Sequence, residues 1–194
     1  MKKLFALFSL LILVSAVNAP KIHALSIGLS ASTQLLFPNV TSSRSWEHET
    51  YVGSTLELTT LDNEKTFGVY VSATGGVAVT PPLDYTSKNL LPPIFGMAVG
   101  FGISAYDGER LSVPFVLAFH GLFKDAADAT LVDIGILGKL AFRVKTTIGL
   151  AFVFQTDISF DMLRLNTPRN GGKTTSTNIN VVGVMPGIGL QYTF

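Results

Sequence analysis

The sequence of 194 residues contains no cysteine. This excludes a disulfide scaffold, a thiolate nucleophile, a cysteine-held metal ion and a lipid attached to an N-terminal cysteine. Charged residues are also scarce, at 14% against about 25% in average proteins. The formal net charge is +1, so the composition gives no reason to expect a nucleic acid partner. The low charge and the mean hydropathy of +0.43 favour contact with an apolar solvent.

Long apolar runs are missing as well. Beyond the N-terminus, no stretch approaches the roughly 18 uninterrupted apolar residues of a membrane-spanning helix. The N-terminal run, residues 4–14, is too short for a permanent anchor. It follows two lysines and precedes small residues, which is the order of a secretory signal peptide. Cleavage after Ala24 or Ala16 fits best, and we expect residues 1–24 to be a signal peptide and residues 25–194 to form one domain.

What the sequence has instead is a repeated alternation of large apolar residues with small or polar ones. At its start, Leu25, Ile27 and Leu29 share one face of an extended chain, while Ser26 and Gly28 share the other. This two-residue period is typical of β-strands. It recurs in eight stretches, namely 25–37, 50–60, 66–79, 94–106, 111–123, 131–144, 147–162 and 178–194. Most of them are long enough to cross a bilayer at a tilt, which takes about 9–11 residues.

The connections between these stretches alternate in length. Long polar segments are expected at 38–49, 80–93, 124–130 and 163–177, and tight turns at 61–65, 107–110 and 145–146. Outer-membrane barrels have this asymmetry, with longer extracellular loops and short periplasmic turns. An even number of strands places both ends of the barrel on the periplasmic side.

The position of the charges separates a membrane barrel from a soluble ligand-binding barrel of the lipocalin type. One face of every stretch is rich in Leu, Ile, Val and Phe, and the other is rich in Gly, Ala and Ser. The charged residues of the strands lie on the small-residue face, and they are Glu57, Asp133, Lys139, Arg143, Asp157 and Asp161. An eight-stranded barrel is too narrow to hold the large face inside. We therefore predict an all-β protein, an eight-stranded antiparallel up-and-down transmembrane β-barrel, with membrane lipid around it.

The last stretch ends in an aromatic residue. Ile188, Leu190, Tyr192 and Phe194 share one face up to the final position. This pattern resembles the C-terminal signal of bacterial outer-membrane proteins, which the barrel-assembly machinery reads. With the signal peptide and the strand pattern, the chain resembles the small eight-stranded outer-membrane barrels of the OmpA transmembrane domain, OmpX and OmpW type. The resemblance implies the cell outer membrane as location and the assembly machinery as partner.

Two sets of inward positions are candidates for function. The charged residues named above, with His120, would either pair as a plug that holds the barrel closed or line a gate or narrow conduit, because unpaired buried charge is costly. The apolar inward residues are Val116, Leu137, Val153, Val181 and Met185. They resemble the hydrophobic interior of OmpW-type barrels, which implies passage of a small hydrophobic molecule, although they would equally fill volume beside glycines.

The remaining alternatives concern the loops and catalysis. The segment around Trp46 and the basic, glycine-rich stretch 166–173 would suit a host surface molecule in an adhesin. Catalysis of the kind found in lipid-modifying barrels needs a His, a Ser and an acid together. His120 has no serine two residues away, and His48, between two glutamates, suits a solvated loop better than a metal site. We therefore expect no enzyme, cofactor or metal.

Overall fold

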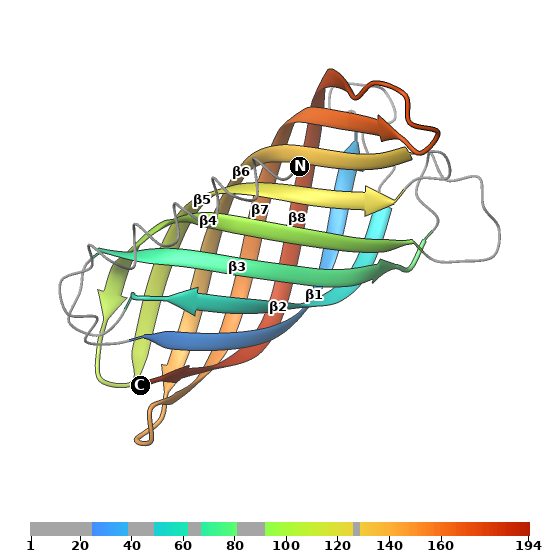
Figure 1. The fold of residues 1–194 in the computed structure, drawn as a ribbon. Helices are drawn as coiled ribbons and strands as arrows, with labels where there is room; N and C mark the ends of the chain where they lie inside the picture. Colours follow the sequence, from blue (N-terminus) through green and yellow to red (C-terminus); the bar gives the residue numbers. More distant parts are fainter. Residues whose placement is uncertain (1–24, 39–48, 62–66, 81–91, 126–128) are drawn as a thin grey trace.

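The computed structural model describes residues 25–38, 49–61, 67–80, 92–125 and 129–194. The signal-peptide prediction for residues 1–24, and the candidates Trp46 and His48, lie outside this part of the chain. The described residues form eight strands in a closed barrel, in which each strand pairs antiparallel with the next and β8 pairs with β1 (Figure 1). The strands are β1 (Ser26–Pro38), β2 (Glu49–Thr59), β3 (Phe67–Ala78), β4 (Pro93–Asp107), β5 (Leu111–Asp125), β6 (Ala129–Lys145), β7 (Leu150–Pro168) and β8 (Thr175–Thr193).

The predicted strand count and antiparallel order are confirmed. Within the described residues, no helix is long and apolar enough to span a membrane. Closure comes from the pairing of the first strand with the last, which runs from Ser26 with Thr193 to Pro38 with Val181. In Figure 1 the C-terminus lies at the end of the barrel opposite the β7–β8 hairpin.

Large apolar side chains cover the outside of the barrel. Phe119 is 71% exposed and Ile188 is 63% exposed, whereas the inward-facing Tyr70 is 1% exposed. Such a surface is unfavourable in water, and closed strands satisfy their backbone hydrogen bonds within hydrocarbon. The soluble lipocalin-like alternative is therefore wrong, and the prediction of a transmembrane barrel is confirmed.

Strands β7 and β8 are longer than the sequence predicted. Each has 19 residues, whereas β2 has 11. The predicted loop 163–177 is wrong for most of its length, since β7 continues to Pro168 and β8 begins at Thr175. Polar residues such as Thr167 and Thr175 lowered the apolar signal. Cross-strand pairing nevertheless continues the sheet, because β7 pairs with β8 up to Asn166 with Thr175 and with β6 up to Pro168 with Ala129.

The predicted alternation of long and short connections also fails at one place. The expected loop 124–130 is mostly strand, because β5 continues to Asp125 and β6 begins at Ala129. The interval 126–128 is thus no longer than the tight turn at 108–110. At the other end of the barrel, β7 begins at Leu150 and not at residue 147, after a turn in which Gly149 has φ of 78°. A non-glycine residue rarely adopts this backbone conformation.

Glycine allows close approach of the wall strands. At Gly100 on β4, a Cβ atom would lie 2.1 Å from the carbonyl oxygen of Leu117 and 2.4 Å from Cα of Ala118 on β5. Both contacts are with backbone, which cannot rotate away. A residue without a side chain is therefore needed at this position for β4 and β5 to pack this closely. The small residues also leave room inside the barrel for charged side chains.

Candidate functional site

The outer part of the barrel interior holds a network of charged and hydroxyl groups. Arg164 on β7 donates from Nε to Asp133 Oδ1 at 2.7 Å and from Nη2 to Asp133 Oδ2 at 2.9 Å. Lys124 on β5 lies 3.1 Å from Asp133 Oδ2 and 3.3 Å from Glu49 Oε2. The Tyr51 hydroxyl donates to the same glutamate oxygen at 3.0 Å. Two carboxylates and two cations thus neutralise one another, and Asp133 has no exposed surface.

A second network crosses the middle of the barrel. Lys139 on β6 donates to Glu57 on β2 and, at 2.9 Å, to Gln155 on β7. The Tyr70 hydroxyl donates to Glu57 at 3.4 Å, and the Lys139 ammonium lies 5.4 Å from the centroid of the Tyr70 ring. Asp157 is the second carboxylate here, with Oδ1 3.9 Å from Lys139 Nζ. One lysine therefore faces two buried carboxylates, and these side chains span the interior from wall to wall.

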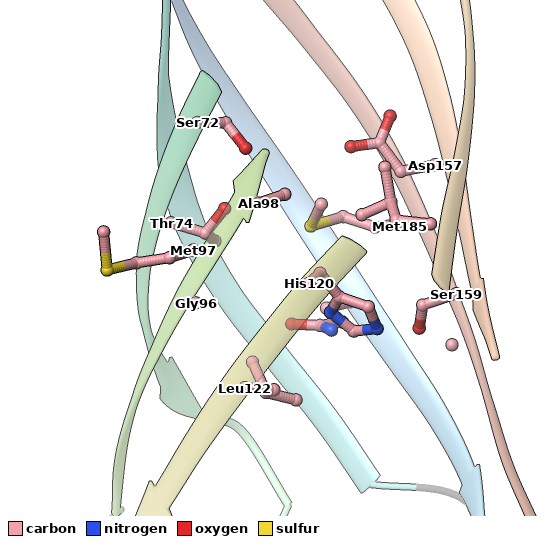
Figure 2. A pocket seen from close by; sticks show the side chains of 13 residues that line it. Ser72, Thr74, Gly96, Met97, Ala98, His120, Leu122, Asp157, Ser159 and Met185 are labelled. Carbon is pink, nitrogen blue, oxygen red and sulfur yellow. The ribbon is translucent and has the colours of Figure 1, made fainter. Parts of the chain in front are cut away.

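A small cavity lies between the two networks. Its volume is about 30 Å³, which is room for about two water molecules. Figure 2 shows Asp157 and Ser159 on one side and Ser72 and Thr74 on the other. His120 also lines it, and its Nε2 lies 2.5 Å from Asp161 Oδ1, close in distance but without hydrogen-bond alignment.

The structure brings together three residues that are separate in the sequence. His120 on β5 and Ser159 on β7 both line this cavity, and Asp161 on β7 lies against His120. Among the described residues, neither Ser159 Oγ nor His120 Nε2 has a hydrogen-bond partner. A nucleophile needs its base within hydrogen-bond reach, and a cavity of about 30 Å³ has no space for an acyl chain. Ser159 and His120 are therefore not arranged as a hydrogen-bonded nucleophile and base.

The opposite end of the interior is more open. A cavity of about 80 Å³ is lined by Leu61, Arg143 and Asp107, among others. Arg143 Nη1 donates to the carbonyl oxygen of Leu61 at 3.3 Å, and Lys145 pairs with Asp107. Leu61 follows β2 and is 2% exposed, so the chain folds into the barrel mouth and narrows it.

The apolar inward candidates are packed. Two buried clusters occupy the interior, one of Leu36, Tyr51, Ala78, Ile94, Leu122 and Val181, the other of Leu61, Tyr70, Ala98, Val116, Ala118 and Leu137. Val153 and Met185 are buried as well, and Met185 lines the small cavity. These side chains pack into two separate clusters inside the barrel.

Sequence reasoning missed three members of the outer network. Glu49, Lys124 and Arg164 were assigned to loops, but all three lie on strands and point inward. Arg164 follows a register shift between Asp161 and Leu163, which turns its side chain toward Asp133. A strand period broken by a β-bulge is not visible in a sequence. The sequence analysis therefore placed Asp133 inside the barrel without its two cationic partners, Lys124 and Arg164.

The C-terminal residues lie on the outside of β8. Ile188, Leu190, Tyr192 and Phe194 are exposed, and the rings of Tyr192 and Phe194 meet edge to face at 5.0 Å between centroids. The Phe194 amide donates to the carbonyl oxygen of Leu25 at 3.1 Å. Phe194 is thus hydrogen-bonded to the residue that directly precedes β1. In the described part of the chain, no group of three or more His, Asp or Glu residues is arranged to hold a metal ion.

The comparisons with known proteins identify the fold. No protein-family model matches the chain, and no curated protein sequence matches it. Among solved structures, Neisserial surface protein A matches with a TM-score of 0.60 at 11% identity, over 88% of this chain and 99% of that one. Ail, the attachment invasion locus protein of Yersinia pestis, matches with a TM-score of 0.52 at 10% identity, over 88% and 98%. The chain therefore has the fold of the small eight-stranded outer-membrane barrels.

Proposed function

We propose that this outer-membrane barrel stays closed to solutes and acts at the cell surface, where an ordered extension of β7 and β8 binds a partner. The observation that carries the proposal is the length of these strands. Each has 19 residues, whereas about 9–11 suffice to cross a bilayer. The apolar outer face of β8 begins near Val182, and the preceding Thr175–Asn178 segment is polar and exposed.

The extension is paired sheet and not a loop. Its pairs run from Leu163 with Asn178 to Asn166 with Thr175, and Figure 1 shows it projecting from one end of the barrel. A surface held in a fixed conformation loses less entropy on binding than a mobile loop does. Its tip carries Arg169, which pairs with Asp125, and the exposed Lys173. These cations favour an anionic surface molecule of a host.

A solved structure of Ail contains the heparin analogue sucrose octasulfate. At 11% identity the likeness concerns the fold, so the proposal rests on the extension of this chain. Heparin is nevertheless a suitable anionic probe.

The second hypothesis is a narrow passive channel, for small hydrophobic molecules as in OmpW-type barrels. The packed apolar residues Val116 and Leu137 favour it by their chemistry, but the networks around Asp133 and Lys139 weigh against it, because they cross the interior. The cavities of about 30 and 80 Å³ are small beside the roughly 300 Å³ or more of ordinary ligand pockets. Assembly by the barrel-assembly machinery through Phe194 remains a further part of the proposal.

Two measurements test the proposal. Refolded mature protein in planar bilayers should give no steady conductance, and cells that display it should bind immobilised heparin and host cells. The double variant R169A/K173A should lose most of this binding, whereas R110A, at a turn on the opposite end of the barrel, should retain it. Steady conductance of the wild type would support the channel hypothesis instead. Equal binding by both variants would exclude the extension as the binding element.

A further inference from the structure

The pairing between β1 and β8 is interrupted in the middle of the barrel wall. Its register runs from Ser26 to Ser32 and resumes at Leu35, so the pairs of Thr33 with Pro186 and of Gln34 with Met185 are absent from it. Proline has no N–H group to donate. Pro114 interrupts the β5–β6 register in the same way, between the pairs of Ser112 and Phe115.

The difference between the two sites is the direction of the proline. Pro114 faces the interior, whereas Pro186 is on the outer surface. Along β8 the exposed apolar residues Ile188 and Leu190 follow it, and Val182 and Val184 precede it on the same face. The interruption at Pro186 therefore lies within the apolar band that faces the membrane.

A groove of about 620 Å³ lies over this interruption. Its floor is one row of outward residues, one from each of five neighbouring strands. In order across the sheet they are Val52, Thr33, Pro186, Thr156 and Leu140. Each is paired with the next in the ladder except Thr33 with Pro186. The central three are small, and two of them carry hydroxyl groups. The groove is within the size range of small-molecule sites, about 300–1,000 Å³.

The next row forms the wall of the groove. Ala31 pairs with Ile188, Ile188 with Phe154 and Phe154 with Phe142, and all four line the groove. The three large side chains are 46–63% exposed, so they stand out into the surrounding medium beside the small residues. This wall is therefore apolar, and the hydroxyl groups lie on the floor.

Polar groups at this depth need partners. Within hydrocarbon there is no bulk water, and backbone groups without a partner are costly. Because Pro186 has no N–H group, β8 cannot donate a hydrogen bond to β1 from this position, and the pair of Thr33 with Pro186 is absent from the register. The hydroxyls of Thr33 and Thr156 flank this position. Polar residues inside the membrane are by default candidates for a functional site.

We infer that this groove is a binding site for one hydrocarbon chain of a membrane lipid, with preference for a chain that carries a hydroxyl group. The apolar wall binds the methylene groups, and the floor of Thr33 and Thr156 exchanges hydrogen bonds with the hydroxyl. The position in the apolar band selects the occupant, because the medium that meets this surface consists of lipid chains. The inference is independent of the surface-binding proposal, since it uses another face of the barrel.

The test uses delipidated, refolded mature protein in detergent, with hexadecanoic acid and 2-hydroxyhexadecanoic acid as probes and native mass spectrometry as readout. The wild type should retain one molecule per barrel, and the hydroxylated acid should bind several-fold more tightly. A31F and T156F fill the groove and should lower retention of both acids at least tenfold. L117F, at an outward position on β5, should behave as the wild type.

Two isosteric variants examine the floor separately. T33V and T156V keep the volume, so they should retain hexadecanoic acid and lose the preference for the hydroxylated acid. Heat-modifiable gel mobility identifies variants that have folded, and the valine variants decide the matter if a phenylalanine variant has not. Equal retention by wild type, A31F and T156F would overturn the inference. A wild-type dimer that A31F dissociates would overturn it too, because a second copy would then occupy the groove.

Discussion

Lys139 on β6 donates a hydrogen bond to Glu57 on β2. The two residues are 82 positions apart in sequence, and their strands are not neighbours in the barrel. The contact therefore crosses the barrel interior. It brings one cation to a glutamate that also accepts from Tyr70 and Gln155. This pair and the outer network around Asp133 both connect opposite walls of the barrel.

We expect K139M to be strongly destabilising, because it leaves Glu57 and Asp157 buried without their cation. Removal of one partner of a buried pair costs about 3–5 kcal/mol. The double variant E57Q/K139M should be less destabilised than K139M. Urea unfolding in lipid vesicles, followed by gel mobility, gives the free energies of unfolding. A double variant as unstable as K139M would contradict this pairing.

The outer network makes a second prediction, on the stability of the extension. R164A removes both hydrogen bonds to the fully buried Asp133, and we expect it to cost about 1–3 kcal/mol. Hydrogen exchange should speed up most in the outer parts of β6, β7 and β8. R169A is the control, because its pair with Asp125 is exposed and such pairs contribute about 0–1 kcal/mol. Identical exchange in both variants would show that Arg164 does not hold the extension.

Close packing of the wall strands can be tested with two glycines. G100A places a Cβ atom against the backbone of β5 and should cost about 1–3 kcal/mol, as overpacking does. G75A is the matched control, since a Cβ atom there would meet nothing within 4 Å. We expect G75A to be neutral or slightly stabilising in the same urea assay. A harmless G100A would mean that β4 and β5 can separate at no cost.

Removal of the final residue tests the assembly signal. Phe194 is exposed and touches Tyr192, so deletion of Phe194 should change the free energy of unfolding by less than about 1 kcal/mol, as exposed positions usually do. In cells, however, the amount of protein in the outer membrane should fall several-fold. V79A, on an exposed valine after β3, is a control. If deletion of Phe194 lowers the yield of spontaneous refolding into vesicles as much as it lowers the amount of protein in the outer membrane of cells, the residue acts through stability and not through recognition.

The alternation of residue types was enough to predict the strands, because side chains of a strand point to opposite faces with a period of two. From Leu25 to Phe37, and in the seven later stretches, it also indicated which face meets lipid, since an eight-stranded interior cannot hold large side chains on every strand. The inward position of Lys139, Asp157 and Asp161 follows from the same period.

Three features were beyond this reasoning. Arg164, Lys124 and Glu49 lie in polar stretches whose sequence is typical of loops, and only pairing with neighbouring strands makes them part of the wall. The β-bulge before Leu163 changes the face of the residues after it. The partner of Lys139 lies on a strand across the barrel, so its identity depends on the stagger with which the barrel closes.

The sequence alone thus determined the number of strands, their antiparallel order and which face of each strand meets lipid. These features depend on a local period and on the size of side chains. The tertiary structure alone decided which charges meet, how far β7 and β8 extend, and where Pro186 opens the ladder beside Thr33. These features depend on the register between strands that are distant in sequence. That register is fixed only when β8 closes on β1, where one residue of slip would exchange every inward side chain for an outward one.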